Sequence, residues 1–264
     1  MTLTSHHKRL LTGLLPLPIL LWVLYTGGVA LLVFLAVLAA LGQWELYSMF
    51  WKQRWGWKLL GIAGGLLLLA AAYLVPASVT VVVAVLFCLF SVLFLTMYSY
   101  DPKGNGFMDV QLLFLGCCYL PLLLHFALAL AWPELLLVVS AAFLSDTAAY
   151  YTGSKWGRRH VWPSISPKKT WMGSAGGLAA CVGVCLLVGL VWGTASSMAF
   201  LLLGVLLNLA AQLGDFFESA LKRSQGIKDS GALLPGHGGI LDRIDSLLFV
   251  LPTYAALRGV MPFF

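Results

Sequence analysis

Apolar stretches long enough to cross a membrane recur along almost the whole chain. Hydrophobic residues make up 61% of the 264 positions, whereas Asp, Glu, Lys and Arg together make up only 10%. A soluble globular domain carries about 25% charged residues, and a helix that spans a bilayer needs about 20 predominantly apolar residues. The chain is therefore predicted to be an all-α integral membrane protein, a single polytopic domain of about nine transmembrane helices.

The expected spans follow the apolar runs, with approximate ends. They are Leu10–Thr26, Gly28–Gly42, Leu59–Pro76, Val79–Tyr98, Val110–Ala131, Leu135–Tyr151, Ser174–Trp192, Met198–Leu213 and Ile244–Phe264. We expect residues 1–140 to supply the N-terminal spans and residues 141–264 the catalytic spans and loops. The first span follows a basic patch, as a cleaved signal does, but Pro16 and Pro18 interrupt it and no small-residue cleavage site comes after it.

The basic residues lie on one side of this arrangement. With nine spans, alternate loops collect all of the 16 Lys and Arg residues except Arg258. Because cytoplasmic loops carry an excess of Lys and Arg, the N-terminus, the long loops and the active site are predicted to face the cytoplasm. The net charge of +6 then belongs to a surface that attracts anionic membrane lipids. These features are typical of a bacterial inner membrane protein and disfavour a nucleic-acid partner.

The segment Ser219–Asp245, SALKRSQGIKDSGALLPGHGGILDRID, is unusually polar for such a chain. Carboxylates near a bilayer are costly, so they indicate function. Asp215 and Glu218 end one helix, and Asp242 and Asp245 begin the next with the same i, i+3 spacing, so each pair presents its oxygens on one face. Oxygen ligands suit Mg²⁺, which also binds substrate phosphates. Compensation of a helix dipole explains one acidic residue at a helix start but not the whole set.

Two further groups of residues indicate phosphate binding. Glycines surround His237 and let the backbone pass close to a phosphate. Upstream, Asp146 and Tyr150 share a helical face, and the loop Ser166-Pro167-Lys168-Lys169-Thr170 offers hydroxyl and ammonium groups that can surround phosphate oxygens. An ordinary positively charged loop is the alternative interpretation. The residues alone thus predict a metal-dependent enzyme that acts on phosphates at the membrane surface.

The polar segment resembles the signature of the phosphatidate cytidylyltransferases, also called CDP-diacylglycerol synthases. The matching pattern is Ser219-x-x-Lys222-Arg223-x4-Lys228-Asp229-x-Gly231-x3-Pro235-Gly236-His237-Gly238-Gly239-x-x-Asp242-Arg243-x-Asp245. Asp146-Thr147-x-Ala149-Tyr150-x-x-Gly153 and Ser166–Thr170 are similar to a second block of this family. The chain departs from the family at Met172, where many members carry Glu.

The resemblance implies a homodimer that uses CTP, phosphatidate and Mg²⁺ to make CDP-diacylglycerol and pyrophosphate. We expect Asp215, Asp242 and Asp245, with Asp229 as a further candidate, to bind one or two metal ions. The implied catalytic residues are Asp215, Lys222, Arg223, Lys228, Asp229, Asp242, Arg243 and Asp245. The implied substrate-binding residues are Asp146, Tyr150, Ser166, Lys168, Lys169, Thr170, Ser219, His237, Gly238 and Gly239.

Other functions fit the sequence less well. A transporter or channel would place polar groups at the membrane midplane, whereas the polar residues here gather towards one face. The CDP-alcohol phosphotransferases carry a different aspartate pattern, and polyprenol or dolichol kinases would lack the full glycine and aspartate block. A catalytically silent paralogue is disfavoured because Asp215, Asp242 and Asp245 are all present.

Overall fold

The computed structural model describes residues 16–75, 93, 97, 105–231, 233 and 238–264. Within these residues the chain is mostly helical, as expected for a membrane protein of this class. By length and composition, 6 helices are able to span a membrane: Gly28–Phe50, Trp55–Leu74, Met108–Ala129, Trp132–Trp156, Trp171–Trp192 and Ser197–Ser224. The expected span Val79–Tyr98 lies almost wholly outside the described residues, and the part of Leu10–Thr26 that is described forms an 11-residue helix.

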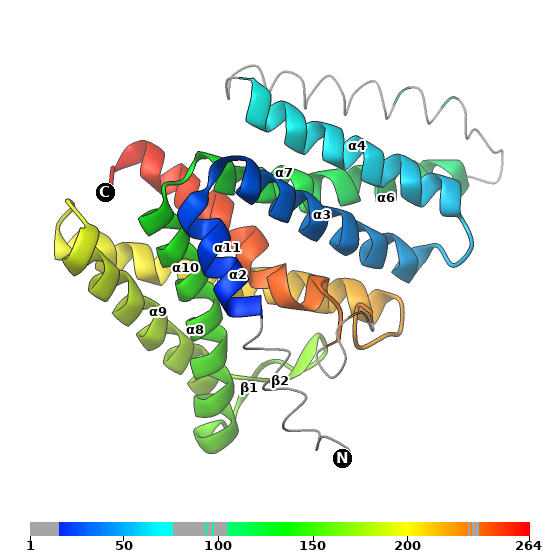
Figure 1. Ribbon diagram of the computed structural model, residues 1–264. Helices are drawn as coiled ribbons and strands as arrows, with labels where there is room; N and C mark the ends of the chain where they lie inside the picture. The colour runs from blue at the N-terminus through cyan, green and yellow to red at the C-terminus, as the bar shows by residue number, and fades with distance from the viewer. Residues whose placement is uncertain (1–15, 76–92, 94–96, 98–104, 232, 234–237) are drawn as a thin grey trace, which may run out of the picture. The chain divides into compact units, whose positions relative to one another are not determined.

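The first of two compact units contains residues 1–129 and the segment 230–241. Its elements are α2 (Pro16–Thr26), α3 (Gly28–Phe50), α4 (Trp55–Leu74), α6 (Asn105–Tyr119), α7 (Pro121–Leu124) and the 3₁₀ helix η1 (His125–Ala129), as labelled in Figure 1. Gly27 separates α2 from α3 with a φ of 60°, a conformation that favours glycine. Tyr47 is completely buried and ties α3 to α6, because its hydroxyl donates to the carbonyl oxygen of Leu113 at 3.2 Å.

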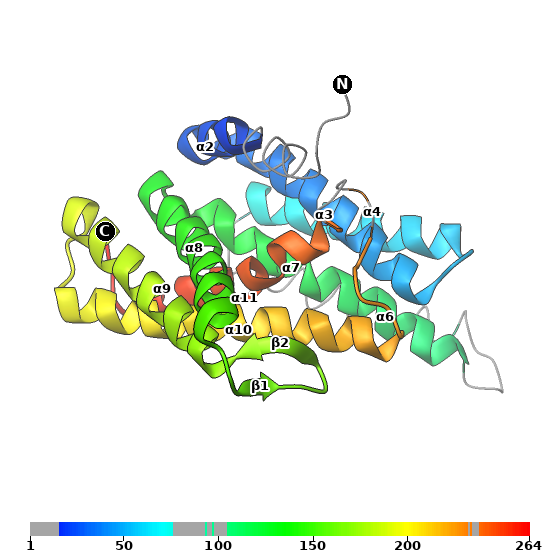
Figure 2. The same cartoon turned by 90° about the horizontal axis from the view of Figure 1, so that it is seen from below.

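The second compact unit contains residues 130–229 and 242–264. Its elements are α8 (Trp132–Trp156), β1 (His160–Trp162), β2 (Ser166–Thr170), α9 (Trp171–Trp192), α10 (Ser197–Ser224) and α11 (Leu241–Val260). Figure 2 shows the β1–β2 hairpin at one end of α8, with β2 leading directly into α9. Thr170 forms this junction: it ends the strand and caps the helix, since its Oγ1 accepts a hydrogen bond from the Gly173 amide at 3.2 Å.

Helices α8 and α9 approach each other through small residues. A Cβ atom placed on Gly177 would lie 3.1 Å from the carbonyl oxygen of Ser145, and one placed on Gly173 would lie 2.8 Å from that of Ala149. Small residues at a membrane helix interface let two backbones come this close. The two helices lie side by side in Figures 1 and 2, and this contact fixes their separation.

One expectation about local structure was wrong. The segment Ser166–Thr170, expected as a loop, is strand β2, which pairs antiparallel with β1 through His160 opposite Thr170 and Trp162 opposite Ser166. Pro167 is compatible with a strand here because the sheet has only two strands, each with a free edge. The eighth expected span, Met198–Leu213, continues as α10 to Ser224.

The extension of α10 places Asp215, Glu218 and Lys222 on a helix. The helix tolerates these charges because Lys222 pairs with Glu218 one turn earlier. In the same way α3 continues beyond the expected end at Gly42 to Phe50 and carries Glu45 inside the helix.

Candidate active site

A cavity of about 550 Å³ opens in the second compact unit, bordered by α8, β2, α9 and α10. Its volume lies within the range of small-molecule sites, about 300–1,000 Å³. The structure brings seven of the predicted site residues to its wall: Asp146, Tyr150, Ser166, Lys168, Lys169, Thr170 and Asp215. The second block of the sequence and Asp215, which precedes the signature, thus share one cavity, although they are far apart along the chain.

Lys169 and Asp215 form an ion pair in the wall of this cavity. The Lys169 Nζ atom lies 2.5 Å from Asp215 Oδ2, and Ser219 Oγ donates to Asp215 Oδ1 at 3.3 Å. Lys169 Nζ also lies 4.3 Å from the centre of the Phe216 ring, which attracts a cation electrostatically. These contacts hold an ammonium group and a carboxylate side by side where a ligand would bind.

A second cluster centres on Lys222. Its Nζ donates to Glu218 Oε2 at 2.9 Å and to Asp242 Oδ1 at 2.6 Å, and so ties α10 to the first turn of α11. Glu218 is completely buried. Lys222 therefore places a positive charge between two carboxylates.

Carboxylates crowd around the start of α11. Asp245 is buried and lies within electrostatic range of Asp215, Glu218 and Asp146. Asp146 Oδ2 accepts a hydrogen bond from Ser246 Oγ at 2.9 Å, whereas the buried Glu218 Oε1 has no hydrogen-bond partner among the described residues. The described part of the chain contains no group of three or more His, Cys, Asp or Glu side chains at the spacing of a metal site.

Four of the remaining signature residues that the structure describes are exposed. Arg223 is exposed and donates to the carbonyl oxygens of Ile227 at 2.8 Å and Ile165 at 3.4 Å, which ties the β1–β2 turn to the end of α10. Lys228, Asp229 and Arg243 are also exposed. Gly238 has a φ of 82°, a conformation that favours glycine. The predicted residue His237 lies outside the described residues.

Sequence reasoning missed two polar residues, one in the cavity and one in the first compact unit. Gln212 lines the cavity one turn of α10 before Asp215. Glu45, on α3, is buried and accepts hydrogen bonds from the segment that leads into α11. The signal for Glu45 was present, because an ionisable side chain in an apolar helix by default indicates a functional site.

The family model described as the cytidylyltransferase family matches residues 7–261. This chain belongs to the cytidylyltransferase family. Three curated relatives carry the name phosphatidate cytidylyltransferase, and each is 34% identical to the chain. The relative from Bacillus subtilis (strain 168) aligns over 93% of this chain and 94% of its own length. The relatives from Staphylococcus aureus (strain COL) and Brucella suis biovar 1 align over 92% and 93% of this chain, and over 95% and 90% of their own lengths.

Membership of the cytidylyltransferase family confirms the resemblance that the signature indicated. The family match also covers the N-terminal helices, which carry no signature residues. Both compact units therefore belong to the part of the chain that this family shares. The match explains why a cavity rich in lysine, hydroxyl and carboxylate groups lies in a chain that is otherwise apolar.

Proposed function

We propose that the protein is a phosphatidate cytidylyltransferase, which converts CTP and phosphatidate to CDP-diacylglycerol and pyrophosphate in phospholipid biosynthesis. The observation that carries the proposal is the alignment of relatives with this name over at least nine-tenths of both chains. The site has the matching chemistry, since its lysines suit phosphate groups and its carboxylates suit a divalent cation.

The reaction requires chiefly that the enzyme bind and align its two substrates. An anionic oxygen of the phosphatidate phosphate attacks the α-phosphorus of CTP. The bond from that phosphorus to the oxygen bridging to the β-phosphorus breaks, and pyrophosphate leaves with the electron pair. Because the nucleophile is already an anion, no general base is needed. The protein must bring two polyanions together in line and neutralise charge in the transition state.

The residues of the cavity are suited to hold one of these polyanions. Lys168 and Lys169 present ammonium groups on β2, and Ser166 adds a hydroxyl to the same wall. Lys169 can exchange its contact with Asp215 for a phosphate oxygen without moving far, since both lie in the lining. The exposed residues Arg223 and Arg243 are assigned to the second polyanion, and the acyl chains stay in the bilayer.

The carboxylates at the α10–α11 junction fit Mg²⁺ by their chemistry. Asp215, Asp242 and Asp245 supply the hard oxygen ligands that this ion prefers, and it needs only one or two carboxylates besides phosphates and water. The crowding of Asp215, Glu218 and Asp146 around Asp245 supports a cation at this place. When bound, Mg²⁺ would neutralise the phosphate oxygens of the substrates.

The setting of the enzyme is also a proposal. We propose about nine spans, with the N-terminus and active site on the cytoplasmic face of a bacterial inner membrane, and a homodimer in contact with anionic lipids. The distribution of Lys and Arg along the chain supports this orientation. The bacterial relatives support the type of membrane.

The direct test is incorporation of radiolabelled CTP into chloroform-extractable lipid by the purified protein. We expect labelled product that requires phosphatidate, is not formed from diacylglycerol, disappears with EDTA and returns with added Mg²⁺. Folded protein that makes no product across several acyl chains and metals would refute the proposed function. Product that persists in EDTA would refute the metal assignment alone.

A further inference from the structure

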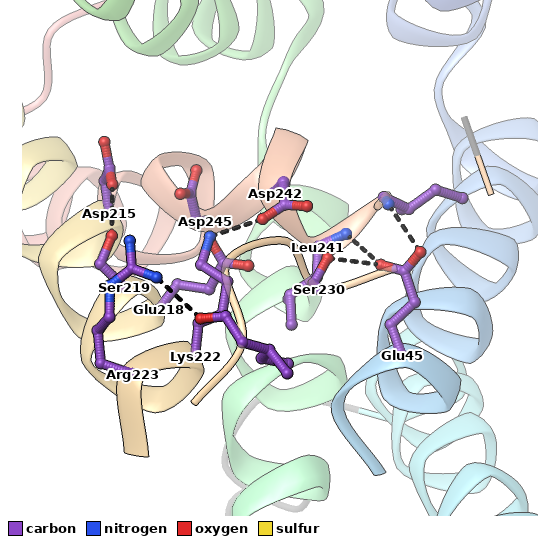
Figure 3. A network of polar contacts seen from close by, with 12 residues as sticks. Glu45, Asp215, Glu218, Ser219, Lys222, Arg223, Ser230, Leu241, Asp242 and Asp245 are labelled. Atoms are coloured by element: carbon purple, nitrogen blue, oxygen red, sulfur yellow. Dashed lines mark hydrogen bonds and ion pairs between the residues drawn. The ribbon is translucent and has the colours of Figure 1, made fainter. Parts of the chain in front are cut away.

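Glu45 is a buried carboxylate whose described hydrogen-bond donors are all uncharged. Its side chain is 3% exposed. Oε1 accepts from the Ile240 amide at 3.1 Å, and Oε2 accepts from the Leu241 amide at 2.9 Å and from Ser230 Oγ at 3.1 Å (Figure 3). These donors belong to the polar signature segment, and all of them lie in the same compact unit as Glu45.

The position of these donors explains why a carboxylate is found there. Leu241 is the first residue of α11, and the first amides of a helix have no partner within the helix. The positive end of the helix dipole also favours a negative charge. A carboxylate that accepts from two amides at once forms hydrogen bonds stronger than those between neutral groups. Glu45 therefore caps α11 from a different helix.

Two glycines of the signature make room for this carboxylate. A Cβ atom placed on Gly231 would lie 2.5 Å from Glu45 Oε1, and one placed on Gly239 would lie 2.8 Å from Glu45 Cδ. Both distances are too short for a real side chain. The glycines at these positions thus serve the approach of the backbone to Glu45.

We propose that Glu45 is a positioning residue, which fixes Ser230, Ile240 and Leu241, the first residue of α11, and thereby the next residue along the chain, Asp242. This inference rests on the proposed function. Glu45 acts through the backbone, because Asp242 follows directly after the amide of Leu241 that Glu45 binds. No described residue of segment 230–241 lines the cavity, so the binding contacts there do not depend on Glu45. Its loss should lower kcat more than it raises KM.

The test compares Glu45→Gln with the wild-type enzyme. The amide nitrogen of Gln cannot accept a hydrogen bond. Whichever oxygen it replaces, the hydrogen bond from the Ile240 amide or the one from the Leu241 amide is therefore lost. We expect kcat to fall about 10- to 100-fold, as for a small misplacement of catalytic groups, with both KM values within about threefold. We also expect hydrogen–deuterium exchange in a peptide covering 238–246 to accelerate at least about tenfold.

Glu134→Gln is the matched control. Glu134 is equally buried at 3% exposure and accepts from a backbone amide at a helix start, that of Ala131 at 2.7 Å, but it lies in the other compact unit. Its other partners, Tyr254 and Arg258, belong to the second half of α11, away from Leu241. It should leave kcat per folded protein and exchange at 238–246 unchanged. Wild-type kcat in Glu45→Gln, unchanged exchange, or an equal loss in both variants would overturn the inference. If wild-type protein makes no CDP-diacylglycerol, the proposed function fails, and the exchange comparison alone decides whether Glu45 holds the segment.

Discussion

Lys222 offers a sharp test of how the carboxylate cluster is stabilised. Its ammonium group is the cation for the fully buried Glu218 and also contacts Asp242. Lys222→Met keeps the length of the side chain and removes only the charge. Removing one partner from a buried ion pair costs about 3–5 kcal/mol, because the remaining charge is left uncompensated. For a chain of this size, that corresponds to a fall of at least about 6 °C in the unfolding temperature.

The assay is thermal unfolding in detergent, followed by reaction of a fluorogenic dye with thiols. Cys181 and Cys185 suit it once the other three cysteines, Cys88, Cys117 and Cys118, are replaced by alanine in every variant. Both are almost completely buried and should react only on unfolding. A second variant makes the argument specific: Glu218→Gln combined with Lys222→Met removes both charges. We expect this pair to recover most of the lost unfolding temperature. The reasoning is refuted if Lys222→Met unfolds like the wild type, or if the double variant is no more stable than the single one.

Three further predictions concern the cavity, the metal and the membrane. Lys169→Met should reduce kcat/KM by about 10- to 100-fold through loss of a charge-assisted phosphate contact; steady-state kinetics with CTP and phosphatidate varied in turn will identify the substrate affected, and unchanged kinetics would exclude Lys169 from the site. Asp245→Asn should lower turnover at least about 100-fold without lowering the unfolding temperature, since it relieves repulsion among carboxylates; a parallel loss of stability would indicate a structural role instead. Ser164→Cys, in the exposed β1–β2 turn of a chain freed of its 5 native cysteines, should react with a membrane-impermeant maleimide only in inside-out vesicles, and labelling from the opposite side would reverse the proposed orientation.

The sequence predicted the membrane class and the family, because these depend on composition and on motifs. The ion pair of Glu218 with Lys222 can also be inferred from the sequence, since the two residues have the helical i, i+4 spacing. The contact of Lys222 with Asp242 could not be predicted in this way, because it joins two helices and no local sequence pattern specifies how they pack.

Glu45 shows the same limit more clearly. It lies 196 residues from Leu241 along the chain, in a helix without signature residues, so no local pattern connects the two. Strand β2 was missed for a different reason. Its five residues contain Pro167 and two lysines, which on their own favour a loop, and pairing with β1 outweighs this preference.

The contact of α8 with α9 through Gly173 and Gly177 has a consequence for how the site can change. Both helices border the cavity, and at Gly173 the nearest atom of α8 is a backbone carbonyl oxygen, that of Ala149. The distance between α8 and α9 in that wall is thus set by the backbone, and a change of side-chain rotamer cannot alter it. Substitutions around the opening, such as at Tyr150, can retune what the cavity attracts while its width stays the same, whereas a single methyl group at Gly173 would force the two helices apart.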